Sequence, residues 1–117
     1  MTLDMIGQYV KPWVSTEELD HICNEFILRN GWKSACIGYH GYPKYTCISS
    51  NDTICHGIPS KNEILKEGDI INIDVTSLVG GYFGDASRMY PVGNISKEAR
   101  DLIQVAKECL DIWLAEV

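Results

Sequence analysis

Two aspartates, Asp74 and Asp85, lie in the stretches IINIDVT and GDAS, whose neighbouring residue types favour β-strands. Removing a carboxylate from water is costly unless a partner compensates its charge. Carboxylates are common ligands of divalent metal ions, and a pair of them can hold one ion or serve two ions about 3.5–4 Å apart. The two aspartates are therefore candidate metal ligands, provided that the fold brings them to one surface.

The chain between and around these aspartates predicts a β-hairpin, with strands over 70–79 and 82–90 joined by a Gly-Gly turn. In the register that a two-residue turn sets, Asp74 and Asp85 are diagonal neighbours on one face, with Cα atoms about 7–8 Å apart. The opposite face is expected to meet the core, and it carries Ile71, Ile73, Val75 and Val79.

A solvated hairpin face would carry the same aspartates at little cost, and the pattern alone leaves this alternative open. Phe83 and Met89 share the aspartate face and favour one that is at least partly covered. A covered face with two like charges requires a compensating cation.

Histidines and soft side chains in two loops are further candidates for chemistry. His56 in CHGIP and His40 in GYHGYP have an imidazole suited to hydrogen bonding or proton transfer near neutral pH, although a solvated loop histidine is the simpler alternative. Cys55 and His56 are not expected to form a nucleophile–base pair for thiol catalysis, because side chains of adjacent residues seldom face each other. An apolar pocket that suits a thioether side chain could be lined by Cys36, Tyr39, Tyr42 and Cys47. Ordinary packing of these four residues is the alternative.

Helices and a short strand are expected to position these loops. Residues 3–10 indicate a short opening helix, and a capping box at Ser15 to Glu18 begins a second helix that ends near Asn30-Gly31. Residues 45–50 predict a strand. A last amphipathic helix follows Gly93 and has no stop signal before Val117, so we expect it to continue to the end of the sequence.

Composition limits the classes of protein that fit. The chain has 117 residues, a net charge of −6 and 45% hydrophobic residues, which indicates one small globular domain or part of a larger one. No basic surface favours nucleic acid, and no apolar run is long enough to span a membrane. Five cysteines without a C-x-x-C pair, and no signal peptide, favour a cytoplasmic protein with reduced thiols.

Four motifs in order, SACIGYHGYPKYTCIS, NDTICHGIP, LKEGDIINIDVT and GYFGDASRMYPVG, closely resemble the type I methionine aminopeptidases. The resemblance extends over nearly the whole chain, from Ser15 to the last helix. It implies the α/β pita-bread fold, in which two pseudo-symmetric halves enclose a dinuclear metal site. Residues 1–117 would form the N-terminal half of that domain, with an antiparallel hairpin and sheet packed by helices.

The resemblance also implies residue roles. Asp74 and Asp85 match the metal ligands of the N-terminal half, and His56 matches the histidine that contacts the scissile amide. The pocket for the methionine side chain would involve Cys36, Tyr39, Tyr42 and Cys47, with His40 in the same loop. Backbone carbonyls at Asn51 and Thr53 match positions that can hold a monovalent cation, Na or K.

The implied activity is removal of the initiator methionine from nascent polypeptides. Two divalent ions, Mn, Fe, Co or Zn, would activate a water molecule and polarise the peptide carbonyl. In the family the remaining ligands, a histidine and glutamates, belong to the C-terminal half and have no counterpart in this sequence. We therefore expect a half enzyme that needs a complementary C-terminal half or a homodimer for activity.

Two alternatives remain at this point. A non-catalytic binding or structural module with the same half-fold would also retain these motifs. A related prolidase or creatinase is a further possibility, although GYHGYP with CHGIP favours the methionine-specific branch. The sequence also has Trp13 where the family usually has glycine.

Overall fold

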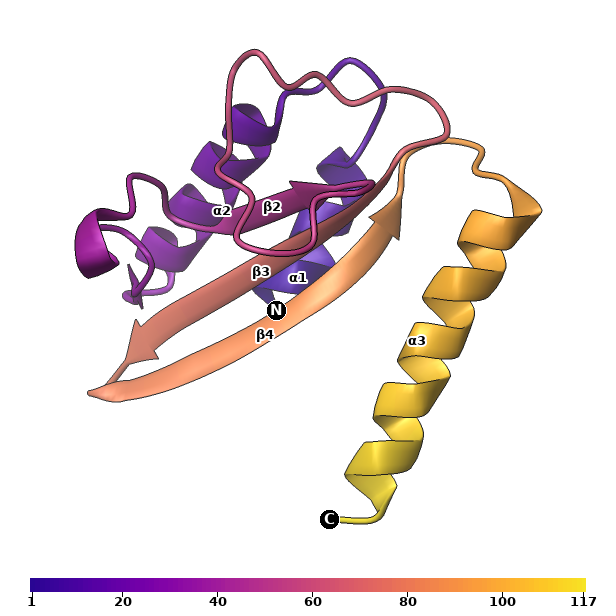
Figure 1. Cartoon of the computed structure of the whole chain (residues 1–117). Coiled ribbons are helices and arrows are strands. Elements are labelled where there is room, and N and C mark those ends of the chain that lie inside the picture. The colour runs from indigo at the N-terminus through magenta and orange to yellow at the C-terminus, as the bar shows by residue number, and fades with distance from the viewer.

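The computed structural model describes residues 1–117, with three α-helices, four strands and two short 3-10 turns (Figure 1). In chain order the elements are α1 (Thr2–Ile6), η1 (Gly7–Tyr9), α2 (Thr16–Arg29), β1 (Lys33–Ser34), η2 (Tyr39–Gly41), β2 (Cys47–Ser50), β3 (Ile70–Val79), β4 (Tyr82–Pro91) and α3 (Lys97–Ala115). Every element that the sequence predicts is present, and β1 and η2 are additions that the pattern did not reveal.

The antiparallel sheet is organised around β3. Strand β4 pairs along the full length of one edge of β3, while β2 and β1 occupy successive stretches of the other edge. The turn between β3 and β4 has positive φ at both Gly80 (58°) and Gly81 (89°), as the twist of a two-residue hairpin requires. The predicted register is confirmed, because Asp74 pairs with Ser87 and Thr76 with Asp85.

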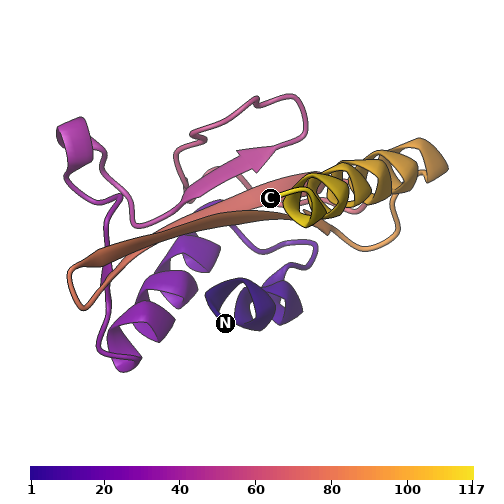
Figure 2. The ribbon, with the colours of Figure 1, turned by 90° about the horizontal axis from the view of Figure 1, so that it is seen from below.

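Helices α1 and α2 cover one face of the sheet, as Figure 2 shows from below. Helix α2 begins at the predicted cap, where the Ser15 hydroxyl accepts a hydrogen bond from the Glu18 amide over 3.1 Å. The helix ends at Arg29 and is capped by Asn30, which is followed by Gly31 at φ 74°. The core between helices and sheet includes Leu19, Cys23, Ile27, Ile48, Ile71, Ile73 and Val75.

Burial differs from the expectation at the hairpin end. Val79 is 40% exposed, because it lies beyond the part of the sheet that the helices reach. Phe83 is 72% exposed, whereas Met89 is half-buried, so the aspartate face is only partly covered over β4 and is open near the hairpin turn. The opposite side of the sheet therefore holds the core, and the aspartate face remains accessible in this chain.

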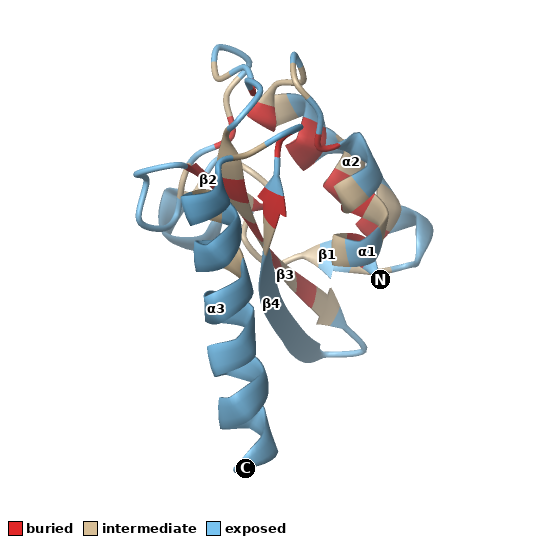
Figure 3. Cartoon of the chain, turned by 90° about the vertical axis from the view of Figure 1, so that its right-hand side faces the viewer, coloured by how far each residue is buried: buried red, intermediate tan, exposed pale blue.

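Helix α3 has no buried residue and stands apart from the other helices and from most of the sheet (Figures 1 and 3). Its apolar residues are exposed, including Leu102 at 62% and Trp113 at 63%. It ends at Ala115 instead of continuing to Val117, and the predicted strand over 45–50 is shortened to Cys47–Ser50. None of the helices is both long and apolar enough for a membrane crossing.

Candidate active site

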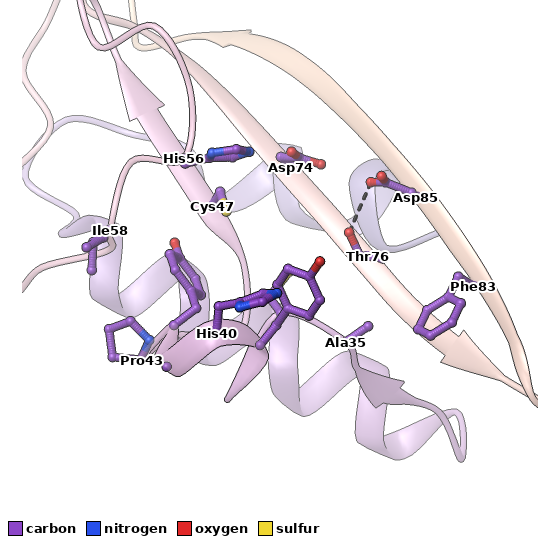
Figure 4. A pocket seen from close by; sticks show the side chains of 14 residues that line it. Ala35, His40, Pro43, Cys47, His56, Ile58, Asp74, Thr76, Phe83 and Asp85 are labelled. Carbon is purple, nitrogen blue, oxygen red and sulfur yellow. Dashed lines mark hydrogen bonds between the residues drawn. The ribbon is translucent and has the colours of Figure 1, made fainter.

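A pocket of about 770 Å³ lies over the aspartate face of the hairpin (Figure 4). Its walls come from the loop between β1 and β2, the loop after β2, and strands β3 and β4. The pocket brings together all eight residues expected to act in catalysis, metal binding or side-chain recognition: Cys36, Tyr39, His40, Tyr42, Cys47, His56, Asp74 and Asp85.

The two aspartates form an electrostatically strained pair. Asp74 is half-buried and Asp85 is exposed. Burial raises the pKa of the Asp74 carboxyl, the negative charge of Asp85 raises it further, and nearby His56 partly offsets this. The Thr76 hydroxyl donates a hydrogen bond to Oδ1 of Asp85 over 3.0 Å, which fixes one oxygen of that carboxylate.

This pair fits part of a divalent-metal site. Two hard oxygen donors whose charges repel each other are a donor set that a cation stabilises. The chain has no group of three or more histidine, cysteine, aspartate or glutamate side chains placed to hold a metal ion. Protein zinc sites typically use at least three protein ligands, so Asp74 and Asp85 are a fraction of a complete ligand set.

His56 is held over the aspartates by the residue that follows it. Gly57 accepts a hydrogen bond from the Ile48 amide (2.9 Å), and its own amide donates to Oγ of Ser49 (3.1 Å). A Cβ atom at Gly57 would lie 2.0 Å from the Ile48 carbonyl oxygen, so only glycine permits this approach. His56 itself has φ 54°, and its ring points toward Asp74 (Figure 4).

The loop between β1 and β2 supplies the aromatic wall. Gly38 donates its amide to the Tyr42 carbonyl over 2.8 Å, and His40 takes a left-handed conformation at φ 46°. The Tyr42 hydroxyl is 3.0 Å from the carbonyls of both Thr46 and Gly57, which ties this loop to the His56 loop. Burial raises the pKa of Tyr42, so its hydroxyl remains protonated and acts as a donor.

The remaining loop residues contribute surface and soft atoms. The Tyr39 and His40 rings pack edge to face with centroids 4.4 Å apart. Cys47 pairs with Asp74 across β2 and β3. Burial raises the pKa of the Cys47 thiol, and the neighbouring Cys36 and Asp74 raise it further, so this thiol is uncharged near neutral pH.

The expected monovalent-cation residues lie outside the pocket. Asn51 has φ 50° and donates its amide to the Ile70 carbonyl over 2.9 Å, while its side chain bridges to Asp69 (3.0 Å). The Thr53 amide donates to the Ser50 carbonyl over 2.9 Å. The backbone carbonyls of Asn51 and Thr53 accept none of the hydrogen bonds that order this turn.

The sequence predicted no role for three residues that shape the site: Gly57, Thr76 and Phe83. Hairpin parity placed Thr76 and Phe83 on the aspartate face, and this was the available signal for both. No sequence signal was available for Gly57. Its close approach to Ile48 joins the loop after β2 to β2 itself, and no periodic pattern predicts that pairing.

A protein-family profile described as metallopeptidase family M24 matches residues 1–117. A methionine aminopeptidase of Buchnera aphidicola (subspecies Schizaphis graminum) is 52% identical over 108 residues, which are 92% of this chain and 41% of that protein. The methionine aminopeptidase of Escherichia coli K12 is 50% identical over 116 residues, 98% of this chain and 44% of that protein.

Solved structures give the same result. The crystal structure of methionine aminopeptidase from Rickettsia prowazekii superimposes with a TM-score of 0.89 at 46% identity, over 92% of this chain and 43% of that one. Escherichia coli aminopeptidase P matches with a TM-score of 0.77 at 22% identity, a likeness of fold alone. The expected pita-bread fold class is confirmed, and the chain spans less than half the length of these relatives.

Proposed function

The chain belongs to metallopeptidase family M24, and from this premise we propose that it forms the N-terminal half of a methionine aminopeptidase domain. The reaction is hydrolysis of the bond after an N-terminal methionine, and the substrates are nascent polypeptides that begin with methionine. The two relatives that are 52% and 50% identical are named methionine aminopeptidase, in agreement with the resemblance of the four motifs.

One observation carries the proposal: a single pocket holds the aspartate pair, a histidine aimed at it and a soft, aromatic wall. The aspartates provide the hydrolytic end of the pocket, and the loop between β1 and β2 provides an apolar end. A substrate with its methionine side chain against Cys36, Tyr39, Tyr42 and Cys47 would present its first peptide bond toward His56.

The candidate site residues have separate parts in this proposal. Asp74 and Asp85 would hold divalent ions, Mn, Fe, Co or Zn, which when bound supply Lewis-acid activation of water and of the scissile carbonyl. His56 hydrogen-bonds the substrate amide and stabilises charge that develops there. His40 contributes to the wall through its contact with Tyr39. Asn51 and Thr53 would hold Na or K through their free carbonyls.

Activity requires donors beyond the two aspartates, because a two-carboxylate set is incomplete. We propose that a complementary C-terminal half supplies them, and that the assembled enzyme acts in the cytoplasm, where nascent chains emerge and thiols remain reduced. A homodimer is the other assembly that would add donors.

The test is reconstitution. The chain is mixed with a separately expressed fragment that contains the remaining C-terminal part of the Escherichia coli methionine aminopeptidase, and release of methionine from Met-Ala-Ser is measured with Mn or Co. We expect no turnover by the chain alone and turnover by the mixture.

Two variants sharpen this experiment. Asp85→Ala removes a proposed ligand and is expected to abolish turnover of the mixture. Asp101→Ala removes an exposed aspartate of α3 that pairs only with Lys97, and should leave turnover unchanged. Turnover that survives Asp85→Ala would exclude Asp85 as a ligand. Turnover by the isolated chain would exclude the need for a C-terminal half, and turnover by its monomeric form would exclude the homodimer as well.

A non-catalytic binding module is the second candidate, and the incomplete donor set favours it. It predicts that the mixture stays inactive although both fragments are folded, and that Mn binds no more tightly to the mixture than to either fragment.

A further inference from the structure

Cys36 and Cys47 come together although eleven positions separate them in the sequence. Ala35 donates its amide to the Thr76 carbonyl over 2.9 Å, so the ladder of β1 continues one residue beyond the strand. Cys36 follows Ala35, and Thr76, the partner of Ala35, is two residues along β3 from Asp74, the partner of Cys47. Neighbouring places along one edge are compatible with the Cα separation of about 4.4–6.8 Å that a disulfide spans.

The two cysteines also border the same pocket. Both are free, both are half-buried, and both line the pocket. Cys36 is near enough to raise the pKa of the Cys47 thiol. The other cysteines are placed differently: Cys23 is buried between α2 and the sheet, whereas Cys55 and Cys109 are exposed.

The segment between Cys36 and Cys47 is suited to a small adjustment. Gly38 and Gly41 both have φ 80°, and His40 lies at φ 46°, so the loop turns through left-handed positions. Glycine adopts such conformations at little cost, so a small change of φ at Gly38 or Gly41 adds little backbone strain.

We propose that Cys36 and Cys47 are a reversible redox-modification site, which forms an intramolecular disulfide in the wall of the pocket. The oxidant is a small disulfide such as oxidised glutathione. One of the two thiols loses its proton, and the resulting thiolate attacks a sulfur of the oxidant, which releases one glutathione thiolate and leaves a mixed disulfide. The second cysteine thiolate displaces the remaining glutathione. The two cysteines lose two protons and two electrons, and the oxidant is reduced to two glutathione molecules.

The disulfide would replace two separate thiols with one rigid bridge beside Asp74. Its formation depends only on this chain and is independent of the proposed function. The consequence for a methionine side chain in the pocket rests on that function and is a separate question.

The experiment uses the full chain with Cys55→Ser, because the tryptic peptide 45–61 would otherwise contain both Cys47 and Cys55. The reduced protein is treated with oxidised glutathione, alkylated and analysed by mass spectrometry. We expect a monomer lighter by two hydrogens, a link between the tryptic peptides 34–44 and 45–61, and full reversal by dithiothreitol.

Matched variants in the same background test the assignment. Cys36→Ser and Cys47→Ser should each abolish the link, and Cys109→Ser should retain it, with circular dichroism used to verify folding. The proposal is wrong if the folded Cys55→Ser protein keeps both thiols alkylatable, stops at a glutathione adduct, or links either cysteine to Cys23 or Cys109. This parent result decides the question even if a serine variant fails to fold.

Discussion

Thr76 and Asp85 face each other across the β3–β4 hairpin, and the Thr76 hydroxyl donates a hydrogen bond to Oδ1 of Asp85 over 3.0 Å. Asp85 is exposed on a strand with no neighbour on its outer side, so little else restrains this carboxylate. The threonine therefore sets the direction in which the second carboxylate oxygen points, toward the pocket that Asp74 shares.

We predict that Thr76→Val weakens Mn binding by the reconstituted enzyme by about 10-fold to 100-fold, the usual effect of losing an outer hydrogen-bond partner of a ligand. Isothermal titration calorimetry measures it. Thr76→Ser keeps the hydroxyl and should restore most of the affinity. Parent-like affinity in Thr76→Val would show that the hydrogen bond does not orient Asp85.

We predict that Gly57→Ala destabilises the chain by about 1–3 kcal/mol, because the added Cβ would overlap the Ile48 carbonyl oxygen at 2.0 Å. Urea unfolding followed by circular dichroism gives the free energy. Gly84→Ala is the matched control, since nothing lies within 4 Å of a Cβ there. Equal losses in both variants would mean that the loop yields freely and does not hold His56 in place.

Trp13 occupies a conformation that favours glycine, with φ 75° and 84% of the residue exposed. Trp13→Gly relieves left-handed backbone strain of about 1–2 kcal/mol in the folded chain. Glycine also raises the conformational entropy of the unfolded chain, which offsets part of this gain in stability. We expect a net gain of about 1 kcal/mol in thermal or urea unfolding. Trp13→Ala retains a Cβ and should show no such gain. A loss of stability in Trp13→Gly would reveal that the exposed ring makes a stabilising contact.

Asp20 is fully buried in α2, where Oδ1 accepts hydrogen bonds from the Thr46 amide (2.8 Å) and hydroxyl (2.7 Å). Its Oδ2 is buried without a partner. Burial raises the pKa of Asp20 above its ordinary value of 3.8, and these hydrogen bonds oppose the rise without cancelling it.

The folded chain therefore holds this proton more tightly than the unfolded chain. The contribution of Asp20 to stability is greatest below pH 3.8 and declines as the pH rises from there through the folded-state pKa. We predict that the stability of the parent relative to Asp20→Asn is higher at acid pH than at pH 7. Urea unfolding across this range measures the difference, with Asp101→Asn as an exposed control. A difference that grows toward pH 7 would reverse the assigned direction.

Local patterns in the sequence determined much of this fold. The alternation along 70–79 and the Gly-Gly turn fixed the hairpin register, and hence the neighbourhood of Asp74 and Asp85, because a strand has a period of two and a two-residue turn permits one pairing. The cap at Ser15 likewise fixed the start of α2. The family resemblance was confirmed by the comparisons, while the roles of individual site residues remain predictions.

Only the tertiary structure decided how the pocket is assembled. The approach of Gly57 to Ile48, and the placement of Cys36 and Cys47 in one pocket, depend on hydrogen bonds between segments that share no periodic signal. Burial was likewise beyond local patterns: Val79 and the apolar side chains of α3 have the residue types of a core, yet they are exposed. A sequence pattern indicates which side chains favour burial, but whether another surface covers them depends on long-range packing.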